Sequence, residues 1–196
     1  MKKFLLTFLI ILLVSIFAIA CNNSSTLSEM NEFPQINFQD TFTQEQTEYI
    51  VYFWQQSCSY CQQVEPDMID FTLNHDIPIY LVDMEIASNQ DAWYDWESHH
   101  KEYDIMIGKE ENGIDSLDHD VKLARFEEDK TVNWTFHKNR AGEIIAAHNT
   151  PYANTQPNDA NELEITGTPT IIHIKNGKIL NYAVGVDPIQ RLLNGR

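Results

Sequence analysis

The residues best suited to chemistry are two cysteines three positions apart, Cys58 and Cys61. Three positions make up nearly one helical turn, so a helix that begins at Cys58 brings both sulfur atoms to one end and permits a short reversible disulfide. The unpaired N–H groups and the positive dipole at that end favour an anion, which stabilises the thiolate of Cys58. We therefore expect Cys58 to be the attacking nucleophile and Cys61, one turn further in, to be the buried resolving thiol.

The segments on either side of the cysteines must position them. Tyr49 to Trp54 is an unbroken run of β-branched and aromatic residues, which predicts a strand buried on both faces. Beyond the cysteines, apolar residues recur at roughly helical intervals, at Val64, Met68, Phe71 and Leu73. The predicted order is a strand, a short loop, the cysteine pair and a helix.

The cysteine pair has two other interpretations. A structural zinc ion needs four ligands, and neither a second cysteine pair nor a nearby histidine pair completes such a set. His99-His100 and Asp118-His119-Asp120 match no ligand spacing, so we expect these residues to be exposed and predict no metal. The alternative interpretation is a permanent structural disulfide between Cys58 and Cys61, since exported proteins keep their disulfides.

The start of the chain has the pattern of an export signal. Lys2 and Lys3 precede an apolar run that ends at Ala20, and at about seventeen residues this run is short for a permanent membrane span of ~20. Cys21 follows Ala18-Ile19-Ala20, which resembles the lipobox of bacterial lipoproteins. That resemblance implies removal of residues 1–20 and lipidation of Cys21. The alternative is an uncleaved anchor helix, and both interpretations attach the protein to a membrane.

The stretch after Cys21 predicts a tether. Residues 21–46 are rich in Ser, Asn, Gln and Thr and show little apolar periodicity, so we expect a flexible spacer and a folded domain over 47–196. A strand within Gln35 to Phe42 is an alternative for part of it, because Ile36, Phe38 and Phe42 share one parity.

Composition narrows the function. The 196 residues predict one globular domain, and 29 acidic against 13 basic residues give a net charge of −16, which argues against nucleic-acid binding. The chain has three cysteines, so lipid on Cys21 leaves only the pair Cys58 and Cys61 and no odd thiol.

The motifs together resemble the thioredoxin superfamily. Trp54 stands four residues before Cys58, Pro66 stands five after Cys61, and Thr168-Pro169-Thr170 precedes the apolar run of residues 171–174. Asn176-Gly177 is a strong hairpin signal before a second apolar run over 179–184, and Asp187-Pro188 predicts the start of a last helix. The resemblance implies an α/β fold, a central mixed sheet flanked by helices, with a cis peptide bond at Pro169.

The same resemblance implies a substrate groove beside the cysteines. It assigns to this groove Trp54, Ser59, Tyr60, Thr168 and Pro169, with the backbone of Thr168 free to pair with an extended client chain. Two departures concern groups that assist proton transfer to the buried cysteine: Tyr52 stands where thioredoxins have an aspartate, and Leu81 where a lysine is common. Ser59-Tyr60 and Thr168 are closer to glutaredoxins and exported disulfide isomerases, so reduction, oxidation and isomerisation stay open.

About eighty residues separate the two halves of the resemblance, which predicts an insertion over about 86–161. Between Asp83 and Lys130 fifteen acidic residues stand against five basic ones, with aromatic residues interleaved at Trp93, Tyr94, Trp96 and Tyr103. We expect an amphipathic helix whose aromatic side chains pack inward, with an acidic lid over the active site as the alternative. A hairpin is expected within residues 131–148.

These observations predict a membrane-tethered, outward-facing thiol-disulfide oxidoreductase. Its expected partners are thiols or disulfides of exported proteins and a redox partner in the membrane, and its chemistry needs no bound cofactor. The alternative is a non-catalytic accessory or binding lipoprotein on the same scaffold, similar to the bacteriocin transport accessory proteins.

Overall fold

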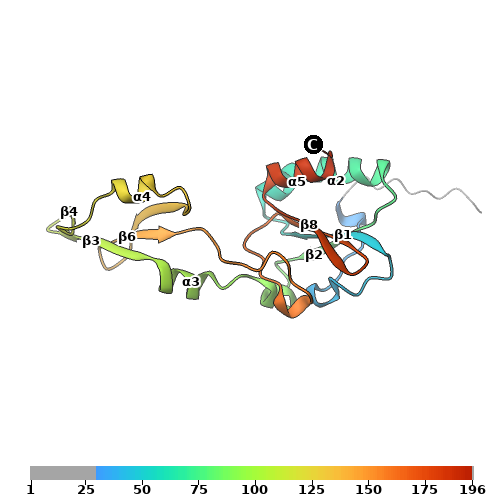
Figure 1. Cartoon of the computed structure of the whole chain (residues 1–196), viewed down its shortest axis with the longest axis horizontal. Helices are drawn as coiled ribbons and strands as arrows, with labels where there is room; N and C mark the ends of the chain where they lie inside the picture. The colour runs from blue at the N-terminus through green and yellow to red at the C-terminus, as the bar shows by residue number, and fades with distance from the viewer. Residues whose placement is uncertain (1–29, 196) are drawn as a thin grey trace, which may run out of the picture.

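Two four-stranded sheets organise residues 30–195, the part of the chain that the computed structural model describes (Figure 1). One sheet belongs to the cysteine lobe, which is built from residues 30–93 and 163–195. The other belongs to the insertion lobe, residues 96–148, which lies beyond one end of the first lobe (Figure 1). Residues 96–148 fall inside the insertion that the sequence predicts over about 86–161.

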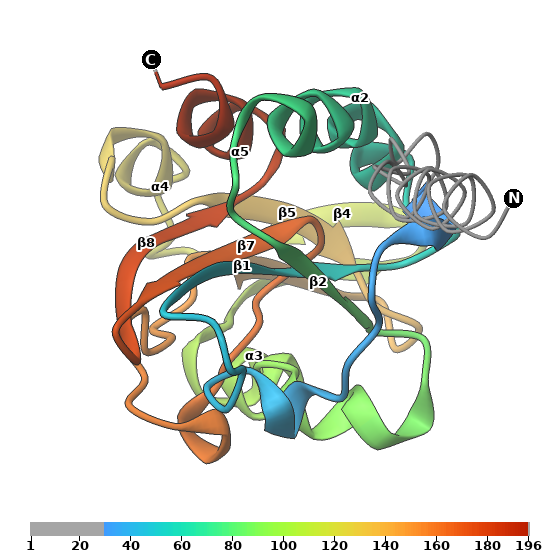
Figure 2. The same cartoon turned by 90° about the vertical axis from the view of Figure 1, so that its right-hand side faces the viewer.

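The cysteine lobe has a mixed sheet in the order β2-β1-β7-β8. Its strands are β1 (Glu48–Trp54), β2 (Ile79–Asp83), β7 (Thr170–Lys175) and β8 (Lys178–Val184). Strands β1 and β2 are parallel, whereas the β1–β7 and β7–β8 pairs are antiparallel. Helices α2 (Ser59–Asn74) and α5 (Val186–Leu193) lie on one face of this sheet (Figure 2). This arrangement confirms the thioredoxin-like α/β fold.

Strand β1 forms the centre of the core and is buried on both faces, as its sequence predicts. Ile50 and Tyr52 pack with the side chains of α2, whereas Tyr49, Val51 and Phe53 pack on the opposite face. Because β1 is buried on both faces, the core holds its carboxyl end in place, and the loop after that end carries Cys58.

The second half of the lobe follows the local turn signals. Asn176 and Gly177 both have positive φ, 51° and 71°, which is the geometry that a two-residue hairpin turn needs. The last helix begins earlier than expected: Gly185, with φ of 84°, precedes Val186, and Asp187-Pro188 lies inside the first turn. Pro188 is tolerated there because the first N–H groups of a helix have no partner within it.

The stretch expected to be a flexible tether is folded over residues 30–46. Met30, Phe33 and Phe38 are buried, and backbone hydrogen bonds tie residues 34–36 to Leu81. The alternative strand is reduced to a bridge at Gln35, followed by the 3₁₀ helix η2 (Phe38–Asp40); η1 spans Met30–Glu32. Met30 and Phe33 pack as single apolar residues among polar ones and leave no periodic pattern, whereas Ile36, Phe38 and Phe42, which share one parity, pack together in one core cluster.

The predicted signal of residues 1–20 and the lipidation site Cys21 lie outside the described residues. Within residues 30–195, no helix has the length and apolar character required to span a membrane.

The insertion lobe has an antiparallel sheet in the order β4-β3-β6-β5. Its strands are β3 (Ile105–Glu111), β4 (Ile114–Leu117), β5 (Trp134–Lys138) and β6 (Glu143–His148), with helices α3 (Trp96–Tyr103) and α4 (Ala124–Glu128). The expected hairpin within 131–148 is the β5–β6 pair. A small core of Ile107, Phe126 and Ala146 holds this lobe together. Two 3₁₀ helices, η3 (Ala87–Ala92) and η4 (Ala160–Glu162), lie on the connections.

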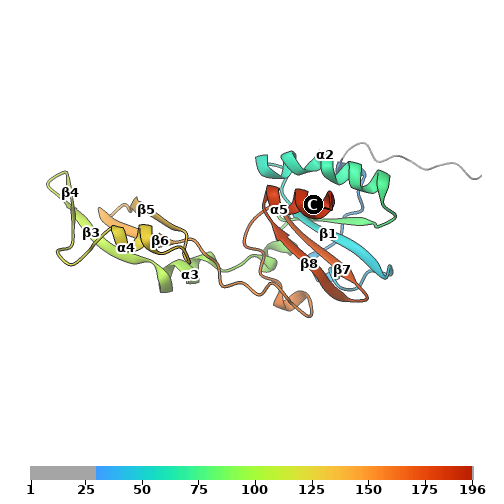
Figure 3. The same cartoon turned by 45° about the horizontal axis from the view of Figure 1, so that its top comes forward.

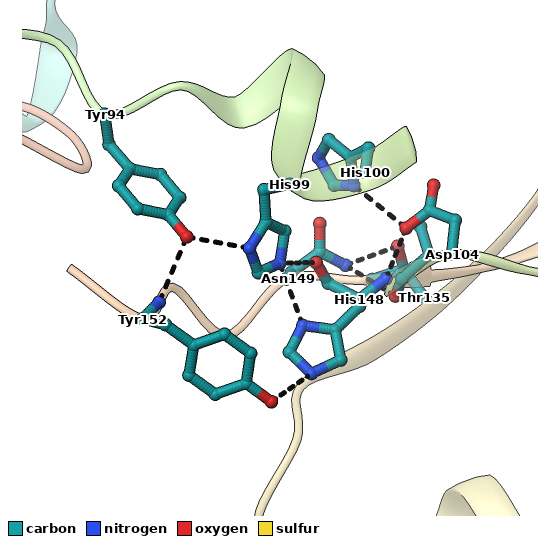
Figure 4. A network of polar contacts seen from close by, with 9 residues as sticks. Tyr94, His99, His100, Asp104, Thr135, His148, Asn149 and Tyr152 are labelled. Carbon is teal, nitrogen blue, oxygen red and sulfur yellow. Dashed lines mark hydrogen bonds and ion pairs between the residues drawn. The ribbon is translucent and has the colours of Figure 1, made fainter. Parts of the chain in front are cut away.

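A buried pair of histidines lies where α3 meets the end of β6 (Figure 4). His99 Nε2 is 2.9 Å from His148 Nδ1, and the two outer nitrogens contact the hydroxyl groups of Tyr94, at 2.8 Å, and Tyr152, at 3.1 Å. The expectation that His99 is exposed is therefore wrong, because α3 packs it against His148. His119 is fully exposed. Within residues 30–195 no cluster of three or more His, Cys, Asp or Glu is suited to hold a metal ion.

Candidate active site

The cysteine pair lies at the junction of β1 and α2. Cys58 is the N-cap residue of α2, and its Sγ accepts a hydrogen bond of 3.1 Å from the backbone N–H of Cys61. The two cysteines are joined as a disulfide, with their Cα atoms 5.2 Å apart. The carboxyl end of β1 and the first turn of α2 lie at the end of the cysteine lobe that faces the insertion lobe (Figure 3).

The two sulfur atoms differ in access. Cys61 is completely buried among the core side chains beneath α2, whereas Cys58 is partly exposed. The first turn of α2 carries no acidic residue, and Ser59 and Tyr60 in that turn are exposed. An incoming sulfur atom therefore reaches Cys58 and not Cys61.

A loop from the far end of the chain lies against Cys58. The Thr168–Pro169 peptide bond is cis, as the resemblance implied, and the carbonyl oxygen of Thr168 is 3.5 Å from Cys58 Sγ. Thr168 Oγ1 donates a hydrogen bond of 2.8 Å to Gln55 Oε1, which joins this loop to the β1–α2 loop. Within residues 30–195, the backbone N–H of Thr168 donates to no acceptor.

Among the other residues assigned to the groove, Trp54 has a different environment. It ends β1, is half-buried and packs with Cys58 against the core beneath α2. Its indole Nε1 is buried and has no hydrogen-bond partner within residues 30–195. Ser59 and Tyr60 are exposed in the turn that follows Cys58, Thr168 contacts Cys58, and Pro169 is buried.

An uncharged hydrogen-bond donor, the hydroxyl group of Tyr52, lies in the protein interior next to Cys61. Tyr52 is completely buried, and its hydroxyl group donates a long hydrogen bond of 3.4 Å to the carbonyl oxygen of Cys61. Burial raises the pKa of Tyr52 well above its ordinary value, and the charge of Glu65 adds to this rise. Burial also raises the pKa of the half-exposed Glu65. Tyr52 therefore stays protonated and cannot accept a proton as an aspartate at this position would.

An acidic residue that the sequence analysis missed lies beside the cysteine loop. Glu85 Oε1 accepts hydrogen bonds from the hydroxyl group and the backbone N–H of Ser57, at 2.5 and 3.2 Å, and these bonds lower the pKa of Glu85. Glu85 follows β2, whose carboxyl end lies beside that of the parallel strand β1. The position of Glu85 just after β2 was the sequence signal that could have predicted its place in the site. No local sequence pattern predicts the contact of Gln55 with Thr168.

Comparisons with known proteins identify the family of the chain. The family model described as a thioredoxin-like domain matches residues 38–194, so the chain belongs to this family. Among solved structures, mitochondrial thioredoxin 3 of Saccharomyces cerevisiae is 10% identical, with a TM-score of 0.40 and coverage of 84% of this chain and 93% of that one. Thioredoxin of Trypanosoma brucei brucei is 11% identical, with a TM-score of 0.40 and coverage of 88% and 95%. No curated protein matches the sequence.

Proposed function

We propose that this protein is a membrane-anchored, extracytoplasmic thiol-disulfide oxidoreductase that acts on exported proteins. The observation that carries the proposal is the asymmetry of the cysteine pair: a partly exposed Cys58 caps α2 and a buried Cys61 lies one turn behind it. An exchange pair needs this arrangement, because one sulfur atom must meet the client and the other must resolve the product.

The reaction in the reducing direction has two displacements. The thiolate of Cys58 attacks one sulfur atom of a client disulfide, which breaks that bond, forms a mixed disulfide and releases the other client sulfur as a thiolate. The thiolate of Cys61 then attacks Cys58 Sγ, forms the Cys58–Cys61 disulfide and releases the second client thiolate. The client gains two electrons and the protein loses two. The oxidising direction is the exact reverse, and a membrane partner of suitable potential restores the starting state.

The free backbone of Thr168 supports recognition of an extended client. A client strand could accept a hydrogen bond from the backbone N–H group of Thr168. Such a strand would lie across Cys58, because Cys58 Sγ is 3.5 Å from the carbonyl oxygen of Thr168. Main-chain hydrogen bonds of this kind supply binding affinity without requiring a particular client sequence, so we propose that the protein acts on many different clients.

The anchoring part of the proposal rests on Cys21 and the apolar segment before it. It is tested by fractionating cells that express the wild-type protein or Cys21→Ala. Lipidation predicts an acyl mass on the Cys21 peptide and membrane retention that the variant loses. Equal retention of both proteins, with no acyl mass, would contradict it.

The redox part is tested by trapping. Cys61→Ser should accumulate mixed disulfides with exported proteins, because Cys58 can still attack but nothing resolves the product. Cys58→Ser is the matched control and should trap almost none. Equal trapping by the two variants would overturn the assignment of Cys58. If the double variant with both cysteines replaced keeps the cellular role of the protein, the accessory-lipoprotein interpretation replaces the enzymatic one.

A further inference from the structure

Four side chains form a cycle of hydrogen bonds where the chain enters and leaves the insertion lobe (Figure 4). The two lobes are joined by a first connection, residues 94–95, and a second connection, residues 149–162 (Figure 1). The two imidazole groups of the cycle are buried, and the exchange reaction at Cys58 makes no use of them. The cycle, which we call the histidine clasp, consists of Tyr94 on the first connection, His99 on α3, His148 at the end of β6 and Tyr152 on the second connection.

A backbone carbonyl group fixes the direction of donation in the histidine clasp. His99 Nε2 is 2.9 Å from the carbonyl oxygen of His148, which can only accept, so Nε2 carries the proton of the His99 ring. His148 Nδ1 is 2.9 Å from the same nitrogen and therefore accepts, which places the proton of His148 on Nε2, 3.1 Å from the hydroxyl group of Tyr152. His99 Nδ1 accepts from the hydroxyl group of Tyr94 at 2.8 Å, and that hydroxyl group receives the backbone N–H of Tyr152 at 3.2 Å. The cycle thus satisfies every ring nitrogen while both imidazole groups are neutral.

A proton added to His148 breaks this cycle at its centre. The one nitrogen of the neutral His148 ring that has no proton is Nδ1, so the added proton points at the N–H group of His99. Two donors then face each other across a contact of 2.9 Å inside the protein. A contact of this kind loses its hydrogen bond and leaves a buried donor without a partner, so the closed cycle disfavours the added proton.

The groups around the two imidazole rings act in the same net direction. The carboxylates of Asp104 and Asp129, at the ends of α3 and α4, raise the pKa of His148. Burial and the charge of His99 lower that pKa by more, so the closed clasp holds a proton at His148 less readily than an ordinary imidazole does. Among residues 30–195, the other titratable groups in contact with the two rings are Tyr94, His100, Tyr103 and Tyr152.

The histidine clasp is joined to the loop that faces Cys58. Trp96, the first residue of α3, packs edge-to-face on the ring of His99, with the ring centroids 5.2 Å apart. The indole N–H of Trp96 donates to the carbonyl oxygen of Thr166 at 3.0 Å. Thr166 lies two residues before Thr168, whose carbonyl oxygen is 3.5 Å from Cys58 Sγ. Loss of the clasp therefore removes the support of a side chain that holds this loop.

We infer that the histidine clasp is an acid-sensitive latch, which is closed while both imidazole groups are neutral, opens when His148 gains a proton, and on opening frees Trp96 from the loop beside Cys58. The inference goes beyond the proposed function, because it involves no redox step. In the open form His148 takes up a proton as an ordinary imidazole does. The open fraction is therefore constant above pH ~6.5 and rises as the pH falls below that value, by up to about tenfold per pH unit.

Hydrogen exchange of the tryptophan indole N–H groups, followed by NMR on the purified full-length protein, tests the latch. The rate for Trp96 is divided by the rate for free tryptophan at the same pH, which gives the protection of this group. This protection should fall by roughly tenfold between pH 7 and pH 5 and should not change in dilute urea, because a local opening exposes little surface. The indole N–H of Trp54 is buried in the cysteine lobe and is the internal control, which should exchange more slowly and respond to urea. Equal rates for the two indole groups, with the same urea dependence, would overturn the latch.

Substitutions separate the histidine clasp from other effects of acid. His148→Asn keeps an acceptor near the place of Nδ1 and gains no proton in this range, so the protection of Trp96 should become independent of pH. His119→Asn is the matched control at a fully exposed histidine and should keep the wild-type response. A full acid response in His148→Asn would overturn the latch.

A smaller change tests the same cycle if His148→Asn does not fold. Tyr152→Phe removes only the hydroxyl group that accepts from His148 Nε2. It should speed the exchange of the Trp96 indole about fivefold at pH 7.5, which corresponds to one lost hydrogen bond, and should keep the acid response. Unchanged exchange in Tyr152→Phe would show that the cycle does not hold Trp96 and would overturn the inference.

Discussion

The thiolate of Cys58 in the reduced protein should be more stable than that of an ordinary cysteine. Its Sγ is the N-cap acceptor of α2 and receives the N–H of Cys61 at 3.1 Å. A hydrogen bond to a charged group contributes about 1.5 to 3 kcal/mol, and the positive end of the helix dipole adds about 0.3 to 1 kcal/mol. Glu85 opposes this effect, but it is exposed to solvent, which screens its charge.

These contributions leave about 1 to 3 kcal/mol in favour of the thiolate, or a roughly 5- to 150-fold increase in the ratio of thiolate to thiol at a given pH. The Cys61→Ser protein isolates Cys58 and keeps the backbone N–H that caps it. Its rate of alkylation by iodoacetamide, measured from pH 5 to 10, should rise with a midpoint clearly below ~8.5, the ordinary value for a thiol. Unfolding the same protein in urea supplies the control, in which the midpoint should return to the ordinary value.

A midpoint at or above ~8.5 in the folded protein would refute this reasoning. It would mean that the contact between the cap and Sγ contributes nothing in the reduced state. Faster alkylation of Cys61 than of Cys58 in the wild-type reduced protein would contradict the assignment of the two roles.

Three other contacts lead to measurable outcomes. Burial, together with the charge of the His99 imidazole, lowers the pKa of His148. The unfolded state therefore binds a proton at His148 more readily than the folded state does. The contribution of His148 to stability is full above pH ~6.5 and is lost as the pH falls below that value. Thermal unfolding at pH 7.5 and 5.5 should show this loss, and His148→Gln should reduce it. Glu85→Gln should speed alkylation of Cys58 at pH 6 by no more than about fivefold, and slower alkylation would be the wrong sign. Thr168→Val removes the hydrogen bond to Gln55 and should destabilise the protein by about 1 kcal/mol in urea unfolding, whereas an unchanged midpoint would show that this bond is not needed.

Strong local signals were sufficient to predict the frame of the active site. The run from Tyr49 to Trp54 admits only a strand buried on both faces, and the apolar spacing after Cys61 admits a helix. Asn176-Gly177 fixes a tight hairpin through its backbone preference. The position of Cys58 at the start of α2 follows from these elements and did not require tertiary contacts.

The parts that sequence reasoning missed depend on contacts between distant segments. Phe33 fills the core as a single apolar residue among polar ones, so no periodic pattern predicts its burial. Gln55 and Glu85 acquire their roles only when loops from different strands meet at the same edge of the sheet.

The same limit applies to the insertion lobe. Every residue of β4 is exposed, so its pattern lacks the alternation that marks a half-buried strand. The buried imidazole groups of His99 and His148 satisfy each other across 49 positions of sequence. A polar residue whose partner is that far away looks like a surface residue until the chain is folded.

The central claim, that Cys58 and Cys61 form a reversible exchange pair, is tested most directly by a redox titration. The purified protein is equilibrated in glutathione buffers of graded potential, quenched with an alkylating reagent and weighed by intact-protein mass spectrometry. An exchange pair should pass from fully reduced to fully oxidised between roughly −270 and −120 mV, the range of known thiol-disulfide oxidoreductases. A disulfide that stays closed in buffers poised below roughly −300 mV would be a permanent structural bond and would contradict the account.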